Sequence, residues 1–420
     1  MIVSPEQRDR IAANLPAWYR AHKRDLPWRG GSAYAVWISE IMLQQTQVAT
    51  VIPFFLRFMA RFPTLESLAS APIDDVLRQW AGLGYYARAR NLHRAAQQIA
   101  AEHGGRLPDD PEAIERLPGI GRYTAGAILS IAYNVPRPLV DANVIRVLSR
   151  LFGLRGDPKA SANQAQLWSI AGQLVPADNP GDFNQGLMEL GALVCRPDDP
   201  LCEQCPLLRD CTAGNSSDPT ALPEIPAGRA TIAVAHSCAI ILSEHTPSPS
   251  PPEAPGNGNE MNRQAGSVTS QSKVEAPTPR GHPLPKSKIP LVLLVQRPAH
   301  GLWGGLWEFP RVACAKGEAP EAAAVRAARE VAGLDTLVGE RVGVVKHGVT
   351  HHRITLHGFL ASAVPPDQEP TPVTCAAVRW VPLDDLGGYA CSSPQTLMRE
   401  ALEAHFTRSR SAEPQYALDI

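Results

Sequence analysis

The chain has 420 residues, 44% of them hydrophobic, and a formal net charge of −1. This length predicts two or three domains with packed cores, and the near-neutral charge means that any surface for a polyanion must be a local patch. No apolar run approaches the roughly 18 residues that cross a membrane, and residues 1–10 lack the apolar core of a secretory signal. We therefore expect a cytoplasmic protein.

The region from residue 1 to about residue 212 is predicted to be helical. Its apolar residues recur at helical spacing, and short Pro/Gly turns separate the segments. The predicted helices span residues 5–22, 34–61, 65–79, 87–103 and 123–132.

After residue 212 the pattern changes. Residues 213–229 are polar and contain prolines, as an interdomain linker does, and residues 230–405 are predicted to form an α+β domain. Within it, residues 246–285 have no aromatic side chain and are predicted to be a disordered insert between two strands. Residues 406–420 are predicted to be a flexible tail. The predicted strands are 230–242, 289–296, 342–347, 354–359 and 378–381, and the predicted helix is 319–332.

Four cysteines stand close together near residue 200, with the spacing C-x6-C-x2-C-x5-C. Two disulfides are one interpretation, but no signal peptide is present. Zinc is another, but structural zinc sites usually pair two short C-x2-C knuckles. One C-x2-C pair with unequal arms favours a [4Fe-4S] cluster over zinc, and zinc over disulfides. The predicted ligands are Cys195, Cys202, Cys205 and Cys211.

A second motif, LPGIGRYTAG at residues 117–126, predicts a tight turn between two helices. Gly119 and Gly121 let the backbone approach a ligand closely, and the next helix presents free N–H groups at its start. Together they suit a DNA phosphate, although a Gly-x-Gly turn alone is more often only a turn. Further on, Asp141 lies among apolar residues, where it is either a helix N-cap or a carboxylate with a catalytic task.

Glu40 lies in the apolar helical motif WISEIMLQQTQV at residues 37–48. A carboxyl in such surroundings is expected to have a raised pKa. It would then carry a proton at neutral pH and could deliver it as a general acid. The alternative, a solvated surface glutamate, lacks a clear polar face in this segment.

These motifs, in this order, resemble those of the endonuclease III superfamily of base-excision glycosylases. The motif at 37–48 and the sequence GLGYYARARNL at 82–92 narrow the resemblance to the adenine DNA glycosylases, the MutY family. It covers residues 8–212 closely and the C-terminal part more loosely. It implies a helix-hairpin-helix fold with a [4Fe-4S] loop. It also implies a monomeric, nucleoid-associated enzyme that flips adenine out of A:8-oxoguanine or A:G pairs in duplex DNA and hydrolyses its N-glycosidic bond.

The resemblance also implies roles for individual residues. Glu40 would protonate N7 of adenine, Asp141 would stabilise the oxocarbenium-like sugar, and Asn143 would hold that geometry. Tyr123 stands where strand-cutting relatives carry a lysine, and since a phenol cannot form an imine, we expect a monofunctional glycosylase in which Tyr123 orients the reacting groups.

The residues expected to contact DNA fall into two sets. The predicted adenine pocket consists of Leu26, Trp28, Arg29, Leu43, Val48 and Gln185, the last reading the base edge. The predicted intercalating and DNA-contacting residues are Gln45, Thr46, Leu83, Tyr85, Arg88, Arg90, Gly119, Gly121 and Arg122.

The C-terminal domain resembles the Nudix fold through LVLLVQRP at 291–298 and GLWGGLWEFP at 301–310. A working Nudix hydrolase needs a Glu-Glu pair three residues after its Arg-Glu, and here residues 332–334 are Ala-Gly-Leu. The resemblance implies that the fold instead reads 8-oxoguanine in the opposite strand. Thr350 and His351 match the reading loop, in which Val349 replaces the family's aromatic residue.

Three other functions compete with this interpretation. A glycosylase for oxidised or mismatched pyrimidines is disfavoured by the missing hairpin lysine and by the Gln-Gln-Thr-Gln sequence at 44–47. A catalytically silent DNA-binding protein has no need of both Glu40 and Asp141. A nucleotide-pyrophosphate hydrolase requires the missing carboxylates of the C-terminal domain.

Overall fold

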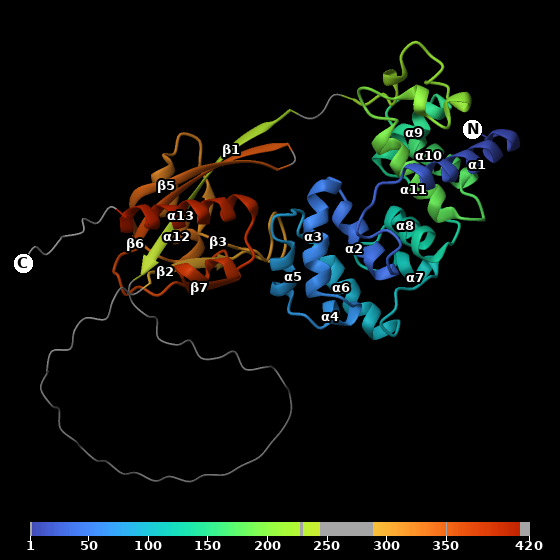
Figure 1. The fold of residues 1–420 in the computed structure, drawn as a ribbon. Helices are drawn as coiled ribbons and strands as arrows, with labels where there is room; N and C mark the ends of the chain where they lie inside the picture. The colour runs from blue at the N-terminus through green and yellow to red at the C-terminus, as the bar shows by residue number, and fades with distance from the viewer. Residues whose placement is uncertain (1, 227–229, 244–288, 350, 412–420) are drawn as a thin grey trace, which may run out of the picture.

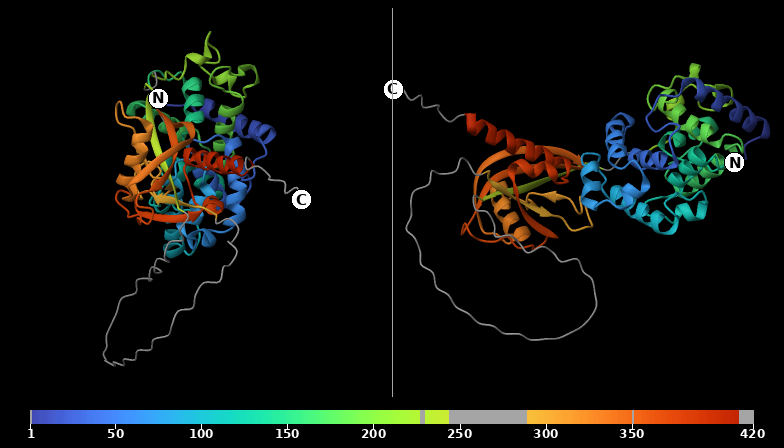
Figure 2. Two further views of the ribbon diagram at one scale, coloured as in Figure 1. Left: turned by 90° about the vertical axis from the view of Figure 1, so that its left-hand side faces the viewer. Right: turned by 60° about the horizontal axis from the view of Figure 1, so that its bottom comes forward.

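The computed structural model describes residues 2–226, 230–243, 289–349 and 351–411, with side chains as far as residue 408. The predicted insert and Thr350 lie outside the described residues. The described chain forms a helical lobe and a second lobe built on a sheet, which lie side by side (Figures 1 and 2). None of the described helices is long and apolar enough to cross a membrane.

The helical lobe contains two apolar cores. The first gathers buried side chains of α2 to α8, and the second gathers those of α1 and α9 to α11. Helix α8 belongs to both, because Ile128 packs into the first core and Ala127 into the second. The helices are α1 (Pro5–His22), α2 (Ala33–Leu43), α3 (Val48–Arg61), α4 (Leu65–Ala69), α5 (Ile73–Trp80), α6 (Ala87–Glu102), α7 (Pro111–Glu115), α8 (Arg122–Tyr133), α9 (Ala142–Phe152), α10 (Ser161–Leu174) and α11 (Pro180–Leu193), followed by the short 3-10 turns Cys202–Gln204, Leu208–Asp210 and Pro219–Ala221.

Two of the predicted helices are each broken in two. The segment 34–61 divides into α2 and α3, because Gln45 has a φ of 55°, which no right-handed helix contains. The segment 65–79 divides into α4 and α5 at Pro72, which is the N-cap of α5. A proline disfavours helical conformation in the residue before it, so it separates the two short helices.

The predicted linker, 213–229, is packed onto the helical lobe as far as Glu224. Ala213 and Leu222 are buried, and the Leu222 carbonyl accepts a hydrogen bond of 2.8 Å from Arg150 Nε. The Glu224 carboxylate accepts the backbone N–H of Gly156 at 2.7 Å. These contacts fix the chain as it leaves the cysteine-containing loop.

All seven strands that the structure describes join one mixed sheet in the order β3-β2-β1-β6-β5, with β4 on β1 and β7 on β2. The β1–β6 pair is parallel and the other pairs are antiparallel. Alternate residues of β1 face opposite sides: Ile240 packs with α13 residues and Ile241 with α12 residues. The elements are β1 (Ile232–Ser243), β2 (Leu291–Gln296), β3 (Trp307–Glu308), β4 (Arg311–Ala313), α12 (Pro320–Ala332), β5 (Thr336–Val349), β6 (His352–Ala363), β7 (Ala377–Pro382), the 3-10 segment Leu383–Gly388 and α13 (Ser393–Ser411), which extends past the predicted start of the tail.

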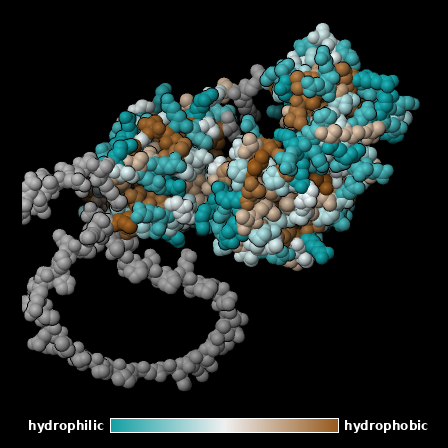
Figure 3. Space-filling view, viewed as in Figure 1, coloured by the Kyte–Doolittle hydropathy of each residue, from teal (hydrophilic) through white to brown (hydrophobic). Residues whose placement is uncertain are grey.

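The two lobes share apolar packing. Trp303, Leu306 and Ala390 of the sheet lobe pack into the first helical core. The Tyr86 hydroxyl donates to the Cys391 carbonyl at 3.0 Å, and the Arg90 guanidinium donates to the Gly304 carbonyl. On the face drawn in Figure 3, hydrophobic residues form separate patches among hydrophilic ones.

Gly126 on α8 allows the chain before Asp141 to pass close to that helix. A Cβ at Gly126 would overlap the Pro138 carbonyl oxygen, whereas a Cβ at Gly172 would meet Pro138 Cγ at 4.0 Å. We expect Gly126→Ala to lower the free energy of unfolding by about 1–3 kcal/mol, through backbone displacement. Gly172→Ala should raise it by about 0.5–1 kcal/mol, because alanine is the better helix former. Urea titration measures both, and equal midpoints for the two variants would contradict the proposed close approach.

Candidate active site

A cavity of about 200 Å³ opens where the two helical cores meet. All ten residues predicted for catalysis and for the adenine pocket line it, although they come from five separate segments of the chain. They are Leu26, Trp28, Arg29, Glu40, Leu43, Val48, Tyr123, Asp141, Asn143 and Gln185.

Glu40 is a buried carboxyl on a helix that is apolar nearly all round. Every residue of α2 from Tyr34 to Met42 is buried, and Glu40 itself is only 4% exposed. Burial, reinforced by the nearby charge of Asp141, raises the pKa of Glu40 to about 7, although a hydrogen bond from Tyr123 opposes this rise. A substantial share of Glu40 is therefore protonated at neutral pH.

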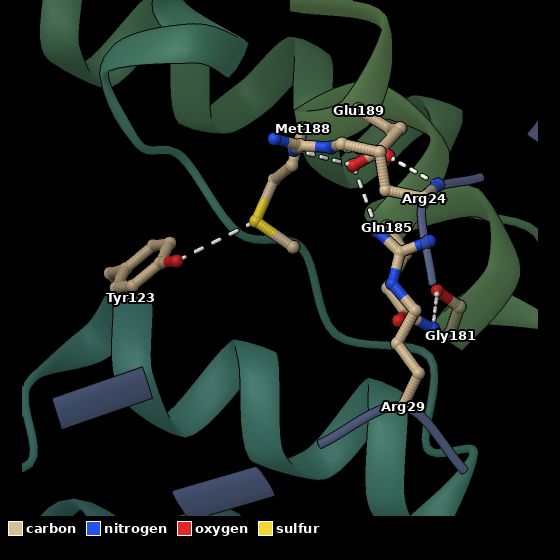
Figure 4. Close-up of polar contacts among 7 residues, drawn as sticks. All are labelled: Arg24, Arg29, Tyr123, Gly181, Gln185, Met188 and Glu189. Atoms are coloured by element: carbon tan, nitrogen blue, oxygen red, sulfur yellow. Dashed lines mark hydrogen bonds and ion pairs between the residues drawn. The ribbon is translucent and has the colours of Figure 1, made fainter. Parts of the chain in front are cut away.

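Tyr123, the second residue of α8, connects this carboxyl to the opposite wall. Its hydroxyl donates to Glu40 Oε2 at 2.7 Å. The same hydroxyl contacts Met188 Sδ at 3.5 Å, as Figure 4 shows. Burial and the neighbouring carboxylates raise the pKa of Tyr123 well above its ordinary value, so that the phenol stays protonated and acts as a donor.

Asp141 is both an N-cap and a wall of the cavity. Its Oδ1 accepts the backbone N–H of Val144 at 2.7 Å at the start of α9, and its Oδ2 accepts Asn143 Nδ2 at 3.1 Å. Burial raises the pKa of Asp141 above its usual value, partly offset by these hydrogen bonds. Asn143 Oδ1 in turn accepts from Arg146 Nη2 at 2.9 Å, which fixes the amide. The two interpretations of Asp141, cap and site residue, are therefore compatible.

The sequence predictions missed Glu189, which organises one end of the cavity. Its carboxylate accepts two hydrogen bonds from the Arg24 side chain at 2.8 and 2.9 Å, and one from Arg29 Nη2 at 2.8 Å (Figure 4). Burial alone would raise the pKa of Glu189, but these arginines bring it below its ordinary value. A lone acid in the apolar stretch GLMELGAL was a signal of the same kind as that of Glu40.

Arg29 keeps one donor for a ligand. Its Nη1 is buried and has no hydrogen-bond partner among the described residues, while its Nη2 is held by Glu189. Close to it, Gln185 Nε2 donates to the Gly181 carbonyl at 3.3 Å (Figure 4). The side-chain carbonyl oxygen of Gln185 therefore does not take part in this hydrogen bond.

The predicted intercalating residues lie on two neighbouring turns. Gln45 and Tyr85 are exposed, have φ values of 55° and 50°, and line a second hollow, which lies between the lobes. Leu83 is buried at 5% exposure, and the hydroxyl of Thr46 contacts the Gln44 carbonyl at 3.3 Å. Positive φ at a non-glycine residue is strained backbone of the kind that collects at functional sites.

Two predicted DNA-contacting arginines have other partners. The guanidinium of Arg88 lies inside the protein against backbone carbonyls of α2 and of the following turns. Arg90 donates across the lobe interface to Gly304.

The hairpin at 117–126 has the predicted form. Gly119 has a φ of 78°, where a Cβ would press against Asn91, and Gly121 is the N-cap of α8 without a capping side chain. The exposed Arg122 guanidinium stacks at 4.0 Å on the ring of Trp168, a residue of α10 that the sequence predictions did not include.

The four predicted cysteine ligands surround one hollow. Cys195, Cys202, Cys205 and Cys211 all line it, and all are free thiols. Arg150, 3% exposed, closes one side: it contacts Cys195 Sγ at 3.5 Å and donates to the carbonyls of Arg196 and Pro197 at 2.6 and 2.7 Å. Within the part of the chain that the structure covers, no three or more His, Cys, Asp or Glu side chains converge closely enough to hold a single metal ion.

The end of β5 faces the hollow between the lobes. His347, Gly348 and Val349 line it together with Gln45 and Tyr85. The rings of His351 and His352 lie 4.1 Å apart just beyond.

Two family models match the chain: a base excision DNA repair protein of the HhH-GPD superfamily over residues 38–173, and a NUDIX domain over residues 289–401. Adenine DNA glycosylases are similar along most of its length. That of Rattus norvegicus is 38% identical over 413 residues, 93% of this chain and 78% of the rat enzyme. The enzyme of Mus musculus is 38% identical, over 94% of this chain and 78% of the mouse enzyme. The enzyme of Homo sapiens is 37% identical, over 90% of this chain and 71% of the human enzyme. The chain belongs to the adenine DNA glycosylase family.

Both predicted folds are thereby confirmed: a helix-hairpin-helix glycosylase lobe and a Nudix-like lobe. The glycosylase is a hydrolase that acts on DNA and removes adenine. This membership decides against a pyrimidine glycosylase, a silent DNA-binding protein and a nucleotide-pyrophosphate hydrolase.

Glu189→Gln tests how strongly its ion pairs stabilise the cavity. The change leaves the Arg24 and Arg29 cations facing each other without a counter-charge, so the free energy of unfolding should fall by about 2–4 kcal/mol. Water screens the charge of Arg24, whose side chain is 36% exposed, so the loss of unfolding free energy should lie toward the lower end of this range. Urea titration at pH 7 measures the loss. In the control Glu112→Gln, both partners of the Arg116 pair are exposed, and no change is expected. A Glu189 variant as stable as this control would contradict the assignment.

Proposed function

We propose that this glycosylase removes adenine paired with 8-oxoguanine or guanine, by flipping it into the cavity and hydrolysing its N-glycosidic bond without cutting the strand. The observation that supports this most strongly is the pairing of Glu40 and Asp141 across one cavity, with the Tyr123 hydroxyl bonded to Glu40. Two carboxyl groups in different surroundings can divide the work of acid and charge stabilisation, as in glycoside hydrolysis.

Glu40 is the proposed acid. A pKa of about 7 lets it hold a proton at neutral pH and still release it. Protonation of N7 withdraws electrons from the bond between N9 and the sugar, and the bond then breaks with positive charge developing on the sugar. Tyr123 positions the carboxyl through its 2.7 Å hydrogen bond.

Asp141 is the proposed stabiliser of that sugar cation. Its carboxylate is held in place by Val144 N–H and by Asn143 Nδ2, so it needs little rearrangement when the charge develops. The aromatic and aliphatic lining of the cavity, with Arg29 Nη1 and the carbonyl oxygen of Gln185 as polar groups, suits a flipped purine.

The nucleophiles that line the cavity support the proposed absence of a strand-cutting step. Tyr123 stands at the hairpin position, and no lysine is among the described residues that line the cavity. Without an amine that can form an imine with the sugar, the reaction ends with base release.

The DNA-binding surface is proposed to run from the hairpin to the second hollow. The uncapped α8 N-terminus behind Gly121, with Arg122 stacked on Trp168, suits a phosphate. Gln45 and Tyr85 protrude on their turns and would fill the gap left by the flipped base. We further propose that the enzyme acts as a monomer in the cytoplasm, at the nucleoid.

The four cysteines are proposed to hold a [4Fe-4S] cluster. Their thiols surround a hollow and do not meet at a point, which fits a body of several atoms better than a single ion. Arg150 places a buried guanidinium 3.5 Å from Cys195 Sγ, where its positive charge would offset part of the negative charge of four cluster-bound thiolates. The cluster would fix the loop 195–211 against α9 and take no part in the base chemistry.

The Nudix-like lobe is proposed to read 8-oxoguanine in the opposite strand. Its strand β5 ends at the hollow that Gln45 and Tyr85 also line, so a base opposite the flipped adenine would lie within reach of His347, Gly348 and Val349. Thr350 and His351 offer a hydroxyl and an imidazole for hydrogen bonds to the lesion.

Glu40→Gln tests the acid. The amide keeps the shape but cannot deliver a proton, so single-turnover adenine release should fall at least about 100-fold while duplex binding persists. In the wild type the rate should decline above pH 7, approaching tenfold per pH unit, because Glu40 loses its proton. At low pH the rate should decline as Asp141, whose pKa is raised, becomes neutral.

The Glu40→Gln variant serves as the control for this pH profile, since its residual rate should lack the alkaline decline. Borohydride added to wild-type reactions should trap no covalent enzyme–DNA adduct. Undiminished release by the variant would exclude Glu40 as the acid, and efficient trapping would exclude the monofunctional reaction.

Thr350→Val tests the reading of the lesion. It removes a hydroxyl at nearly constant volume, so the ratio of single-turnover rates for A:8-oxoguanine and A:G should fall at least about fivefold, the smallest discrimination expected for a lost base contact. Thr374→Val is the matched control, because its hydroxyl bonds to the Glu330 carbonyl at 3.0 Å on the surface of the same lobe. An unchanged ratio in Thr350→Val would remove this residue from the reading site.

A further inference from the structure

Arg88 sits at the centre of the two turns that carry Gln45 and Tyr85. From the first turn of α6 its side chain extends inward, and Nη1 contacts the carbonyls of Ile41, Met42 and Gln44 at 2.9, 3.0 and 2.5 Å. Its Nη2 contacts Thr46 Oγ1 at 3.3 Å and the carbonyls of Leu83 and Gly84 at 3.5 and 3.3 Å. One guanidinium therefore joins both turns, which are about 40 residues apart in the sequence.

Two of these contacts reach carbonyls at the end of α2. Helix α2 ends at Leu43, so its last carbonyls have no intrahelical donor. Arg88 supplies that donor and places a cation at the helix C-terminus, where the helix dipole favours it. The same helix carries Glu40 one turn earlier.

The turns that Arg88 joins are the strained ones. Gln45 and Tyr85 both have positive φ, and glycines with φ values of 98° and 77° precede Tyr85 at positions 82 and 84. Such conformations persist only where surrounding contacts over-determine them. The Tyr85 ring also lies 5.3 Å from the Arg88 guanidinium carbon, and the Trp80 ring 5.5 Å from it.

Arg88 has no carboxylate partner among the described residues, and burial lowers its pKa to about 10, so it still carries its charge at neutral pH. A buried cation without a counter-ion is costly unless its donors are used. The planar fork of arginine can reach two turns at once, which the single ammonium group of lysine cannot do.

We propose that Arg88 is a positioning residue that clamps the two turns in the strained conformation that presents Gln45 and Tyr85 to the base stack. This inference rests on the proposed intercalating role of those two residues. Arg88 acts through them and does not contact a DNA phosphate.

The experiment measures single-turnover adenine release and base extrusion by the full-length protein. Extrusion is followed by the fluorescence of 2-aminopurine placed beside the target adenine. We expect Arg88→Met and Arg88→Lys each to slow release about 10- to 100-fold and to reduce the fluorescence change. The salt dependence of duplex binding should stay unchanged, because loss of a phosphate contact would lower its slope by about 0.9. The matched control is Arg57→Met, an exposed arginine that donates to the Gln79 carbonyl at 2.8 Å and should leave release unaltered.

A double-mutant comparison separates the clamp from other roles. In a Gln45→Ala/Tyr85→Ala background, Arg88→Met should slow adenine release by less than about a further threefold. The two side chains that Arg88 positions are then absent, so its loss has little left to affect. Full additivity, a lowered salt slope or wild-type rates in both Arg88 variants would each overturn the proposal. Thermal melting shows whether a variant is folded, and Arg88→Lys replaces Arg88→Met if only the latter unfolds.

The same experiment tests the premise on its own. If Gln45→Ala/Tyr85→Ala releases adenine at the wild-type rate, the intercalating assignment fails, whatever Arg88 does. If that variant is slow and the Arg88 loss adds to it in full, the assignment stands and the clamp fails.

Discussion

The burial of the Glu40 carboxyl is the constraint on which the helical lobe is organised. A carboxyl becomes a proton donor at neutral pH only if it is removed from water, and one helix cannot achieve that. Here α2 is enclosed by the first core, while α8 and α9 bring Tyr123 and Asp141 from the boundary with the second core. The cavity exists because two separately packed cores meet there, and α8 belongs to both.

Buried and partly buried arginines hold the loops around this centre. Arg88 joins two turns and the end of α2, Arg150 binds carbonyls of the cysteine loop, and Arg146 bridges Asn143 to the Cys195 carbonyl at 2.9 and 2.7 Å. Each guanidinium satisfies several backbone oxygens at once, as its rigid fork of donors allows. Irregular segments can thus be fixed near the site without regular secondary structure. Arg146 and Arg150 lie one turn apart on α9, the helix that Asp141 caps, so the cysteine loop and the Asp141 carboxylate share one support.

The sequence predicted what depends on local pattern. Helical spacing located α1, α6 and α8 to within a residue or two. The residues that the motifs indicated for catalysis and for the adenine pocket all line the same cavity. It did not predict the break at Gln45, because the residues there are good helix formers and the left-handed turn depends on Arg88 from elsewhere in the chain. The DNA contacts of Arg88 and Arg90 stay predictions. The sequence did not show the carbonyl partners of these two arginines, because those carbonyls belong to distant segments of the chain. Glu189 was missed because its partners, Arg24 and Arg29, lie about 160 residues away.

The position of β1 in the sheet has a consequence for how the two lobes can be separated. The chain enters the Nudix-like lobe through β1, which lies between β2 and β6 in the middle of the sheet and also pairs with β4. A single peptide-bond cleavage after Ser243 would leave the central strand attached to the helical lobe and the rest of the sheet on the other fragment. The fragments would then be held together by strand complementation, as a non-covalent heterodimer. After cleavage at this bond, release of the helical lobe from its neighbour would require denaturation of the sheet.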